Sequence, residues 1–405
     1  MTARHSKEPQ NMPKTVVSLG WAMMCACLSY VMTLGVFALY LKSIGHSQTS
    51  IGFLEGLFEA ISFFVKLFSG VISDILRNRK GMILLGYAFL VISPPTVALS
   101  TSALGACVGR ALNRIGNGIY SVPRDALVGD VAPKHMRGQC FGLNRSMGTI
   151  GSIMGGIIAF VAMHYFHCGF KAIFALAGIS VLIGIFMIMF HVKDSYAEPT
   201  EVTTPTPRQK FKLSDLRELG WDYALIMCVA AVFWLSRIEE AFMPLYANLH
   251  FDLPLSYIPL IMTVYNITYT LSSYPIGILA DRTNRIVFLG IGIVILILAD
   301  LSFFAATTIT EFWVGVILWG VQMGIAMNTF TTIIVDITPK KLHGTAFGCY
   351  YIICAICVIM SNSSAGYISE TWGNRYAYLV SAFIASLSLI ILMLVMKYRK
   401  ISATH

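Results

Sequence analysis

Charged residues are scarce in this sequence. Only 12% of its 405 residues are Asp, Glu, Lys or Arg, whereas 56% are hydrophobic, and the mean hydropathy is +0.72. A soluble globular domain carries about 25% charged residues, roughly twice as many. This shortage excludes an ordinary soluble domain and indicates a chain that lies mostly in lipid.

The sequence also lacks the patterns that catalysis and cofactor binding require. Its motifs include no Ser/His/Asp, metal-ligand or phosphate-loop arrangement. Its nine cysteines are odd in number and scattered through apolar runs, which argues against a regular disulfide framework. We therefore expect that the protein is not an enzyme and that it binds neither a metal nor a cofactor.

Long hydrophobic runs are abundant instead. A helix needs roughly 20 apolar residues to cross the hydrocarbon core of a bilayer. We expect an all-α integral membrane protein with twelve transmembrane helices, which cover approximately residues 16–41, 49–73, 81–100, 102–127, 139–162, 170–191, 220–247, 255–280, 286–305, 309–335, 345–369 and 374–396.

Basic residues fall unevenly among the loops that join these runs. Positive residues are retained on the cytoplasmic side of a membrane. Most of the 29 Lys and Arg residues lie on the side of the N-terminus, and only Lys42, Lys171 and Arg375 lie in loops on the other side. We therefore expect both termini in the cytoplasm and the protein in a bacterial inner membrane. The net charge of +9 reflects this topology and gives no indication of nucleic-acid binding.

One stretch of the sequence occurs twice. DVAPKHMRGQCFG at residues 130–142 returns as DITPKKLHGTAFG at residues 336–348. Between the two copies, residues 193–219 are rich in Pro, Thr and charge, which is typical of a linker. The repeat predicts two homologous six-helix bundles, residues 1–192 and 220–405, joined by a cytoplasmic linker. Carriers built from such repeats bind their solute between the bundles, near the middle of the membrane.

A second repeated pattern lies between the second and third expected helices of each bundle. The second half reads GILADRTNR at residues 277–285, and the first half has a looser copy at residues 70–80. Glycine lets a neighbouring helix approach closely, and the carboxylate can face a helix N-terminus or an Arg. We expect a cytoplasmic gate formed by both copies and by the charged end of the fourth helix, comprising Gly70, Asp74, Arg124, Asp125, Gly277, Asp281 and Arg282, with Asp130 beside them.

These patterns resemble the major facilitator superfamily over essentially the whole chain. Residues 277–285 are similar to its signature G-x-L-A-D-R-x-G-R, whereas Ile75 stands where the first-half copy would have Arg. Residues 113–127 and 141–145 are similar to a bacterial branch with the pattern DRxGKGxRxxPRDAL followed by FGxHRxxD. The resemblance implies a secondary carrier that works by rocking of two bundles, with the first, fourth, seventh and tenth helices lining the cavity.

Some polar and charged residues fall inside the expected spans, where a charge costs about 2.5–3.5 kcal/mol at the helix centre. Arg110, Arg114 and Asn117 share one face of the fourth helix, within about 60° of one another at 100° per residue. We expect these three residues to bind the substrate. Further candidates on other helices are Tyr30, Asn266 and Gln322.

Acidic residues inside the spans are candidates for binding a coupling ion. Glu55 and Glu59 share a face of the second helix. Other charges are expected towards the outer side of the seventh span, at Arg237, Glu239 and Glu240. Alternatively, these charges simply pair with one another, for instance Arg114 with Glu59, and lock the first bundle. Because two arginines one turn apart repel unless an anion joins them, a binding role for Arg110 and Arg114 is favoured.

Three functions fit these features. A carrier for a small anionic solute, such as a carboxylate or a carboxylate-type siderophore, explains the arginine pair. A proton-driven exporter of amphipathic drugs explains Glu55 and Glu59, and the glycines from Gly148 to Gly156 resemble the antiporter signature G-x-x-x-G-P-x-x-G-G of exporters. A non-transporting membrane scaffold or receptor would use the fold alone. The expected partners are the solute, the bilayer and protons, and we expect a monomer that binds no nucleic acid.

Overall fold

The computed structural model describes residues 12–194, 218–282, 285–339 and 342–402, and their side chains except at residues 71, 134, 274–282, 326–328 and 398–402. The described residues form helices and no strand, which confirms the expected all-α membrane fold. In chain order the helices are α1 (Lys14–Ser43), α2 (Gln48–Leu76), α3 (Arg79–Leu99), α4 (Ala103–Val131), η1 (Lys134–Met136), α5 (Arg137–His164), α6 (Phe170–His191), α8 (Gly220–Ser236), α9 (Phe242–Phe251), η2 (Leu255–Tyr257), α10 (Ile258–Arg282), α11 (Arg285–Ala305), α12 (Ile309–Ile337), α13 (His343–Thr371) and α14 (Asn374–Ser402).

Short polar residues fix the starts of several of these helices. The side chains of Ser47 and Ser102 accept backbone N–H bonds at the starts of α2 and α4. Thr308 and Glu311 form a capping box at the start of α12. Such side chains replace the backbone acceptors that the first turn of a helix lacks. These caps define where the helices begin, and the apolar runs that follow form separate helices of a length that suits a bilayer.

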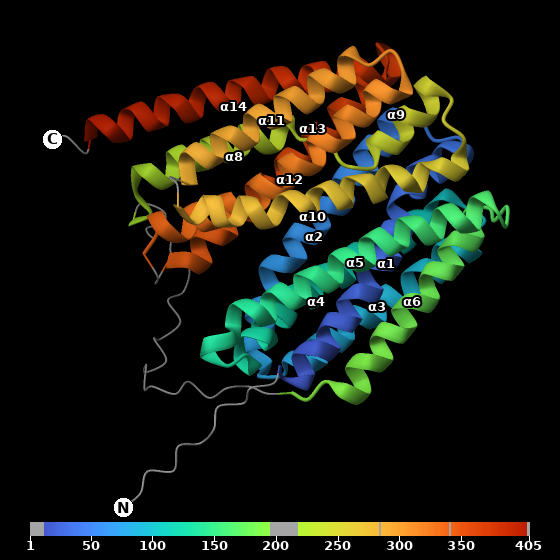
Figure 1. Ribbon diagram of the computed structural model, residues 1–405, viewed down its shortest axis with the longest axis horizontal. Coiled ribbons are helices and arrows are strands. Elements are labelled where there is room, and N and C mark those ends of the chain that lie inside the picture. Colours follow the sequence, from blue (N-terminus) through green and yellow to red (C-terminus); the bar gives the residue numbers. More distant parts are fainter. Residues whose placement is uncertain (1–11, 195–217, 283–284, 340–341, 403–405) are drawn as a thin grey trace, which may run out of the picture.

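The helices run roughly along one direction, and the start of α1 and the end of α14 lie at the same end of the molecule (Figure 1). On one side Figure 1 shows α1, α3, α4, α5 and α6, and on the other side α8, α10, α11, α12 and α14. The helices α2 and α13 pack along each other and join the two sides. We call this end, where α1 begins and α14 ends, the termini end. The opposite end, with the loops at residues 44–47 and 165–169, is the far end.

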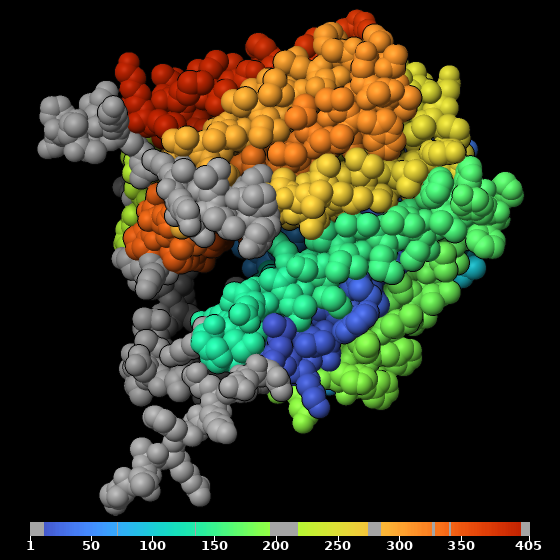
Figure 2. Space-filling view, in the orientation of Figure 1, coloured from blue at the N-terminus to red at the C-terminus, as the bar shows by residue number. Residues whose placement is uncertain are grey.

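Glycines bring the two sides together near the far end. A Cβ on Gly52 of α2 would collide with the carbonyl oxygen of Asn362 in α13, and a Cβ on Gly156 of α5 would collide with Thr263 of α10. At the far end the hydroxyl of Thr49 also donates a hydrogen bond of 2.5 Å to Glu370. At the termini end, Figure 2 shows the molecule hollowed between the teal start of α5 and the orange helices of the other side. The two sides therefore meet closely at the far end and are separated at the termini end.

The structure supports the predicted membrane spans in part. Within the described part of the chain, the helices that are long and apolar enough by themselves to cross a membrane are α1, α3, α5, α6, α11, α12, α13 and α14. The expected count of twelve is therefore approximate. The seventh expected span is wrong as a single helix, because residues 220–247 are divided between α8 and α9, with a break at residues 237–241. The break contains the charged residues Arg237, Glu239 and Glu240.

Candidate functional site: a buried charge network

Two buried arginines lie on α4, where the sequence predicts a substrate-binding face. Arg110 is 2% exposed and Arg114 is 4% exposed. Glycines on the same helix let its neighbours approach closely, since a Cβ on Gly118 would meet Val65 of α2 and a Cβ on Gly116 would meet α3. This close packing fixes α4 against α2 and α3 and brings both guanidinium groups within reach of the carboxylates of α2.

Each arginine binds a carboxylate of α2. Arg110 Nη2 lies 3.3 Å from Glu55 Oε2, and Arg114 Nη1 lies 2.5 Å from Glu59 Oε2. The side chain of Glu55 is completely buried, and that of Glu59 is 16% exposed. The pairing of charges within the first half, which the sequence allows as an alternative, is thus present.

Arg114 also binds a carboxylate from the second half of the chain. Its Nη2 lies 2.9 Å from Oε1 of Glu239, which is buried in the break between α8 and α9. One guanidinium group therefore connects α2, α4 and the break. The sequence places Glu239 towards the outer side of the seventh span and does not pair it with Arg114, whereas the structure brings the two side chains together. The interruption of the helix lets this carboxylate face α4.

Side chains of α13 hold the backbone of the break. Ser361 Oγ donates a hydrogen bond of 2.8 Å to the carbonyl oxygen of Arg237, and the backbone N–H of Glu239 donates one of 2.7 Å to Asn362 Oδ1. In lipid every backbone polar group needs a partner inside the protein. These side chains replace bonds that a continuous helix would make, so the chain can unwind here without leaving the groups unpaired.

The other charges of the break form a second pair. Arg237 Nη2 lies 3.1 Å from Glu240 Oε1, and the hydroxyl of Tyr265 donates to the same oxygen at 3.1 Å. The guanidinium carbon of Arg237 lies 5.3 and 5.1 Å from the ring centroids of Trp234 and Trp319. These distances suit cation–π attraction. Aromatic rings and one carboxylate therefore hold Arg237, while Glu239 is left to bind Arg114.

We call these residues together the charge network, which comprises Arg110, Arg114, Arg237, Glu55, Glu59, Glu239 and Glu240. Its carboxylates outnumber its guanidinium groups by four to three. Among the described residues, Arg110 Nε and Nη1 and Arg114 Nε are buried without a hydrogen-bond partner. Leaving a buried donor unpaired costs about 1–3 kcal/mol. An acceptor that entered the network, such as a carboxylate oxygen, would therefore be bound favourably.

Tyr30, predicted to bind substrate, lies beside both arginines of α4. Its ring centroid is 5.3 Å from the guanidinium carbon of Arg114 and 5.8 Å from that of Arg110. Asn117 lies about one turn beyond Arg114 on α4 and is half-buried. The structure therefore brings Tyr30, Arg110 and Arg114 together with the coupling-ion candidates Glu55 and Glu59.

The two candidates in the second half have different surroundings. Asn266 Nδ2 donates a hydrogen bond of 2.7 Å to the carbonyl oxygen of Met262 in its own helix. Gln322 is completely buried, and neither of its amide atoms has a hydrogen-bond partner among the described residues. It lies one turn from Trp319, which contacts Arg237. Their role in binding stays a prediction.

The sequence analysis missed the connection between the two halves. The available signal is the run Arg237-Ile-Glu-Glu240 in the middle of an apolar stretch, because ionisable residues at such a depth usually face a partner or a cavity. Nothing in the sequence pairs Glu239 with Arg114 rather than Arg110. Its backbone partner Asn362 lies 123 residues further along the chain.

The gate residues of the first half form two separate groups. Asp74 and Asp130 both face Arg79 at the start of α3, with Arg79 Nε 2.8 Å from Asp130 Oδ2 and Arg79 Nη2 3.6 Å from Asp74 Oδ1. A Cβ on Gly70 would press on Val122 of α4, so α2 and α4 pack closely here as the glycine predicts. In the second half, Arg285 pairs with Asp336, the residue that corresponds to Asp130 in the repeat. The side chains of Gly277, Asp281 and Arg282 lie outside the described residues.

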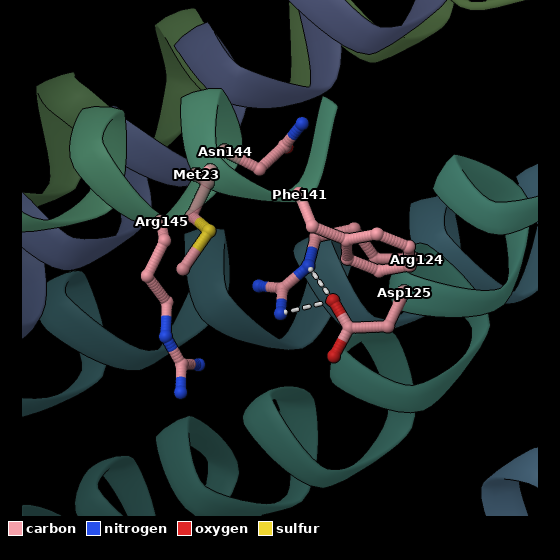
Figure 3. A pocket seen from close by; sticks show the side chains of 7 residues that line it. Met23, Arg124, Asp125, Phe141, Asn144 and Arg145 are labelled. Atoms are coloured by element: carbon pink, nitrogen blue, oxygen red, sulfur yellow. Dashed lines mark hydrogen bonds and ion pairs between the residues drawn. The ribbon is translucent and has the colours of Figure 1, made fainter. Parts of the chain in front are cut away.

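Arg124 and Asp125 form the second group and line a pocket between α1, α4 and α5 (Figure 3). Both Arg124 Nε and Nη2 donate to Asp125 Oδ1, at 3.0 and 2.7 Å. Figure 3 shows Arg145 across the pocket from this pair, with Met23 and Phe141 between them. The pocket has a volume of about 480 Å³. Its lining residues include neither Arg79 nor the two carboxylates that bind Arg79, so this pocket is distinct from the first group.

Comparison with known proteins agrees with this architecture. The Major Facilitator Superfamily model matches residues 19–361 and, in a second match, residues 240–404. An uncharacterized MFS-type transporter of Methanocaldococcus jannaschii is 25% identical over 374 residues, which cover 90% of this chain and 91% of that protein. The quinolone resistance protein NorA of Staphylococcus aureus is 24% identical over 235 residues, 57% of this chain and 58% of that protein.

Solved structures show the same fold at low sequence identity. A POT family transporter in complex with 5-aminolevulinic acid superimposes with a TM-score of 0.74 at 13% identity, covering 97% of each chain. The human organic anion transporter MFSD10 gives a TM-score of 0.64 at 15% identity, covering 94% of this chain and 100% of that one. Family match, helical architecture and apolar spans agree, and the chain is a multi-pass membrane protein of the Major Facilitator Superfamily.

Proposed function

We propose that this protein is a secondary active transporter that moves a small solute by alternating access. Its moving parts would be the two bundles, residues 1–192 and 220–405, with the linker and both termini in the cytoplasm of a bacterial cell. The contact between Arg114 and Glu239 supports this proposal, because it is a buried ion pair between the two halves of the chain. The close seam at the far end and the hollow at the termini end suit a state open to one side only (Figure 2).

The proposed solute is an organic anion, such as a carboxylate or a carboxylate-type siderophore. The observation that carries this proposal is that Arg114 already binds two carboxylates, one from each half of the chain. A carboxylate of the solute has the same chemistry as Glu239 and would take its place on the guanidinium group. The unpaired donors on Arg110 and Arg114 would donate hydrogen bonds to the second oxygen of the solute carboxylate. Binding would then release the link between the halves and permit them to move.

A second candidate function is proton-driven export of amphipathic cations. The excess of carboxylates over guanidinium groups in the charge network favours it, since a cation could bind Glu59 or Glu239 when a proton leaves. The similarity to the quinolone resistance protein NorA points in the same direction over 57% of the chain. The two functions differ in the charge of the solute, so one measurement separates them.

Thermal unfolding of the purified protein tests these proposals. A ligand at 100 times its dissociation constant adds about 2.7 kcal/mol to the free energy of unfolding. We expect stabilisation by members of a panel of mono-, di- and tricarboxylates, and none by a matched panel of lipophilic cations. Stabilisation by cations alone would replace the anion proposal with the exporter proposal. Every stabilising compound is then tested for uptake into proteoliposomes, because binding without flux would indicate a receptor.

A further inference from the structure

We propose that Asp300 of α11 is a proton-binding site that controls the break between α8 and α9. The inference rests on the proposed function, in which it makes the proton the coupling ion. Asp300 is 1% exposed, and its Oδ2 lies 2.5 Å from the hydroxyl of Ser381 in α14. The same hydroxyl lies 2.5 Å from the carbonyl oxygen of Ser236, the last residue of α8. Ser381 thus bridges a buried carboxyl group and the edge of the break.

The count of hydrogens in this bridge favours a proton on Asp300. A serine hydroxyl carries one hydrogen, and a carbonyl oxygen can only accept. If Ser381 donates to Ser236, its short contact with Asp300 needs a hydrogen from the carboxyl group. If Ser381 donates to an ionised Asp300, two oxygens face each other at 2.5 Å without a hydrogen between the hydroxyl and Ser236. Only a protonated Asp300 provides a hydrogen for its contact with Ser381 while Ser381 donates its own hydrogen to Ser236.

The surroundings of Asp300 also favour the neutral form. One titratable neighbour is Tyr378 of α14, whose buried hydroxyl has no hydrogen-bond partner among the described residues. Tyr246 of α9 packs against that ring, at 5.5 Å between centroids, and donates its hydroxyl to the carbonyl oxygen of Phe303. Both groups are neutral phenols, which cannot compensate a buried negative charge.

The charged groups on neighbouring elements are engaged elsewhere. Arg237 follows Ser236 directly, but its guanidinium group binds Glu240 and two Trp rings. Arg375 of α14 stacks on Phe304 and Tyr376 at the surface, and Glu311 of α12 binds the backbone of Thr307 and Thr308. Within the described ranges, no cation lies at ion-pair distance from Asp300. An ionised Asp300 would therefore be an uncompensated charge at membrane depth.

Loss of this proton would rearrange the bridge. Ionised Asp300 only accepts hydrogen bonds, so the hydroxyl of Ser381 would donate its hydrogen bond to Asp300. The proton that Asp300 releases passes to water. The carbonyl oxygen of Ser236 would then lose its hydrogen bond from Ser381, and the C-terminal end of α8 would be free to change its conformation. The next residues carry Glu239, which binds Arg114. Protonation of Asp300 would thus stabilise the link between the two halves, and deprotonation would weaken it.

Two variants separate this role from a purely structural one. Asp300→Asn has an amide that donates to Ser381 at every pH and so imitates the protonated acid. Ser381→Ala removes the bridge and leaves the carboxyl group in place. The measurement is hydrogen exchange of residues 236–242 in the full-length protein across a pH series, divided by the exchange of residues 176–188 in α6, which corrects for intrinsic pH dependence.

We expect the ratio to rise about three- to tenfold in the parent as the pH increases, which corresponds to the loss of one hydrogen bond. Asp300→Asn should keep the low ratio at every pH, and Ser381→Ala should show the high ratio at every pH. A parent ratio that does not change with pH, or an Asp300→Asn ratio that follows the parent, would overturn the proposal. Infrared difference spectra provide the second measurement, since the band of a buried neutral carboxyl group should be present in the parent and absent in Asp300→Asn. The same band in both proteins would also overturn it. Neither measurement uses a solute, so their outcome is independent of the proposed substrate.

Discussion

Arg114 of α4 binds Glu239 of the second half at 2.9 Å and, through its other terminal nitrogen, Glu59 of α2 at 2.5 Å. Removing one partner of a buried ion pair costs about 3–5 kcal/mol, because it leaves an uncompensated charge. A movement that separates the two halves would leave the buried carboxylate of Glu239 without a cation, whereas Arg114 would keep Glu59. A proton on Glu239 would neutralise that charge, and a solute carboxylate would take the place on Arg114 that Glu239 leaves. Both steps concern Arg114 and Glu239, and they lead to the first two predictions.

Substitution of Arg114 should affect both binding and flux. Arg114→Lys keeps the positive charge but loses the planar fork that pairs with carboxylates, so we expect weakened transport. Arg114→Gln leaves Glu59 and Glu239 facing each other without a cation, so we expect loss of transport and of stabilisation by carboxylates. Arg124→Gln is the control, because Arg124 pairs with Asp125 in the separate pocket, and it should leave ligand affinity nearly unchanged. The measurements are vesicle flux and ligand-induced stabilisation of the parent and the three variants at matched expression. If Arg114→Gln binds and moves carboxylates as well as the parent, the anion proposal fails.

Neutralising Glu239 should tighten binding of an anionic solute. The carboxylate of Glu239 competes with the solute for Arg114, and an amide competes less strongly because hydrogen bonds between charged groups are the stronger ones. We expect Glu239→Gln to lower the dissociation constant of the solute about tenfold, equivalent to about 1.4 kcal/mol, and to slow turnover. Titration of ligand-induced stabilisation gives the first quantity and vesicle flux gives the second.

Glu240→Gln is the matched control for this experiment. Glu240 lies next to Glu239 in the break but binds Arg237 and Tyr265 instead of Arg114. It should leave the dissociation constant of an anion close to that of the parent. Equal tightening by both substitutions would show that general charge, and not competition at Arg114, determines the affinity.

The sequence predicts the fold well because hydropathy and repetition are local signals. The two copies of the repeated stretch begin at Asp130 and Asp336, and each of these residues pairs with an arginine at the start of a helix, Arg79 or Arg285. Two homologous stretches thus make homologous ion pairs. The arginine face of α4 and its possible pairing with Glu59 also follow from helical periodicity alone.

The break at residues 237–241 could not be predicted in the same way. Hydropathy predicts one span over residues 220–247, because the four charged residues of this stretch, Asp222, Arg237, Glu239 and Glu240, are outweighed by the apolar residues around them. The break depends on Ser361 and Asn362, which reach it from α13. The sequence around Glu239 gives no signal for partners so far along the chain.

The expected topology can be tested without any ligand. Reporter domains fused after residue 200 and after residue 405 should both be active in the cytoplasm, because most basic residues lie in loops on that side. A reporter in the loop at residues 165–169 should be active outside. This third fusion is the control, since it lies at the far end of the molecule, opposite the termini end (Figure 1). An external signal from either of the first two fusions would contradict the predicted orientation.

A side chain at Gly52 should prevent closure of the far end. The Cβ of Gly52→Ala would collide with the carbonyl oxygen of Asn362, which cannot move without displacing α13. Overpacking of this kind costs typically about 1–3 kcal/mol, so we expect a lower unfolding temperature and a shift towards a form that is open at the far end. Labelling of a cysteine introduced at Thr49 with an impermeant maleimide measures this opening, after subtraction of the signal from the native cysteines.

Gly138→Ala in the same Thr49→Cys background is the control for this test. A Cβ on Gly138 meets nothing within 4 Å, so this substitution adds the same methyl group without a collision. It should label at the rate of the parent, whereas Gly52→Ala should label faster. The contact between α2 and α13 joins the two halves at the far end. Loss of this contact would disfavour the state that is closed at the far end, so faster labelling should be accompanied by slower transport. Equal labelling of the two alanine variants would show that α2 and α13 can separate by another route, and that the glycine contact does not close the far end.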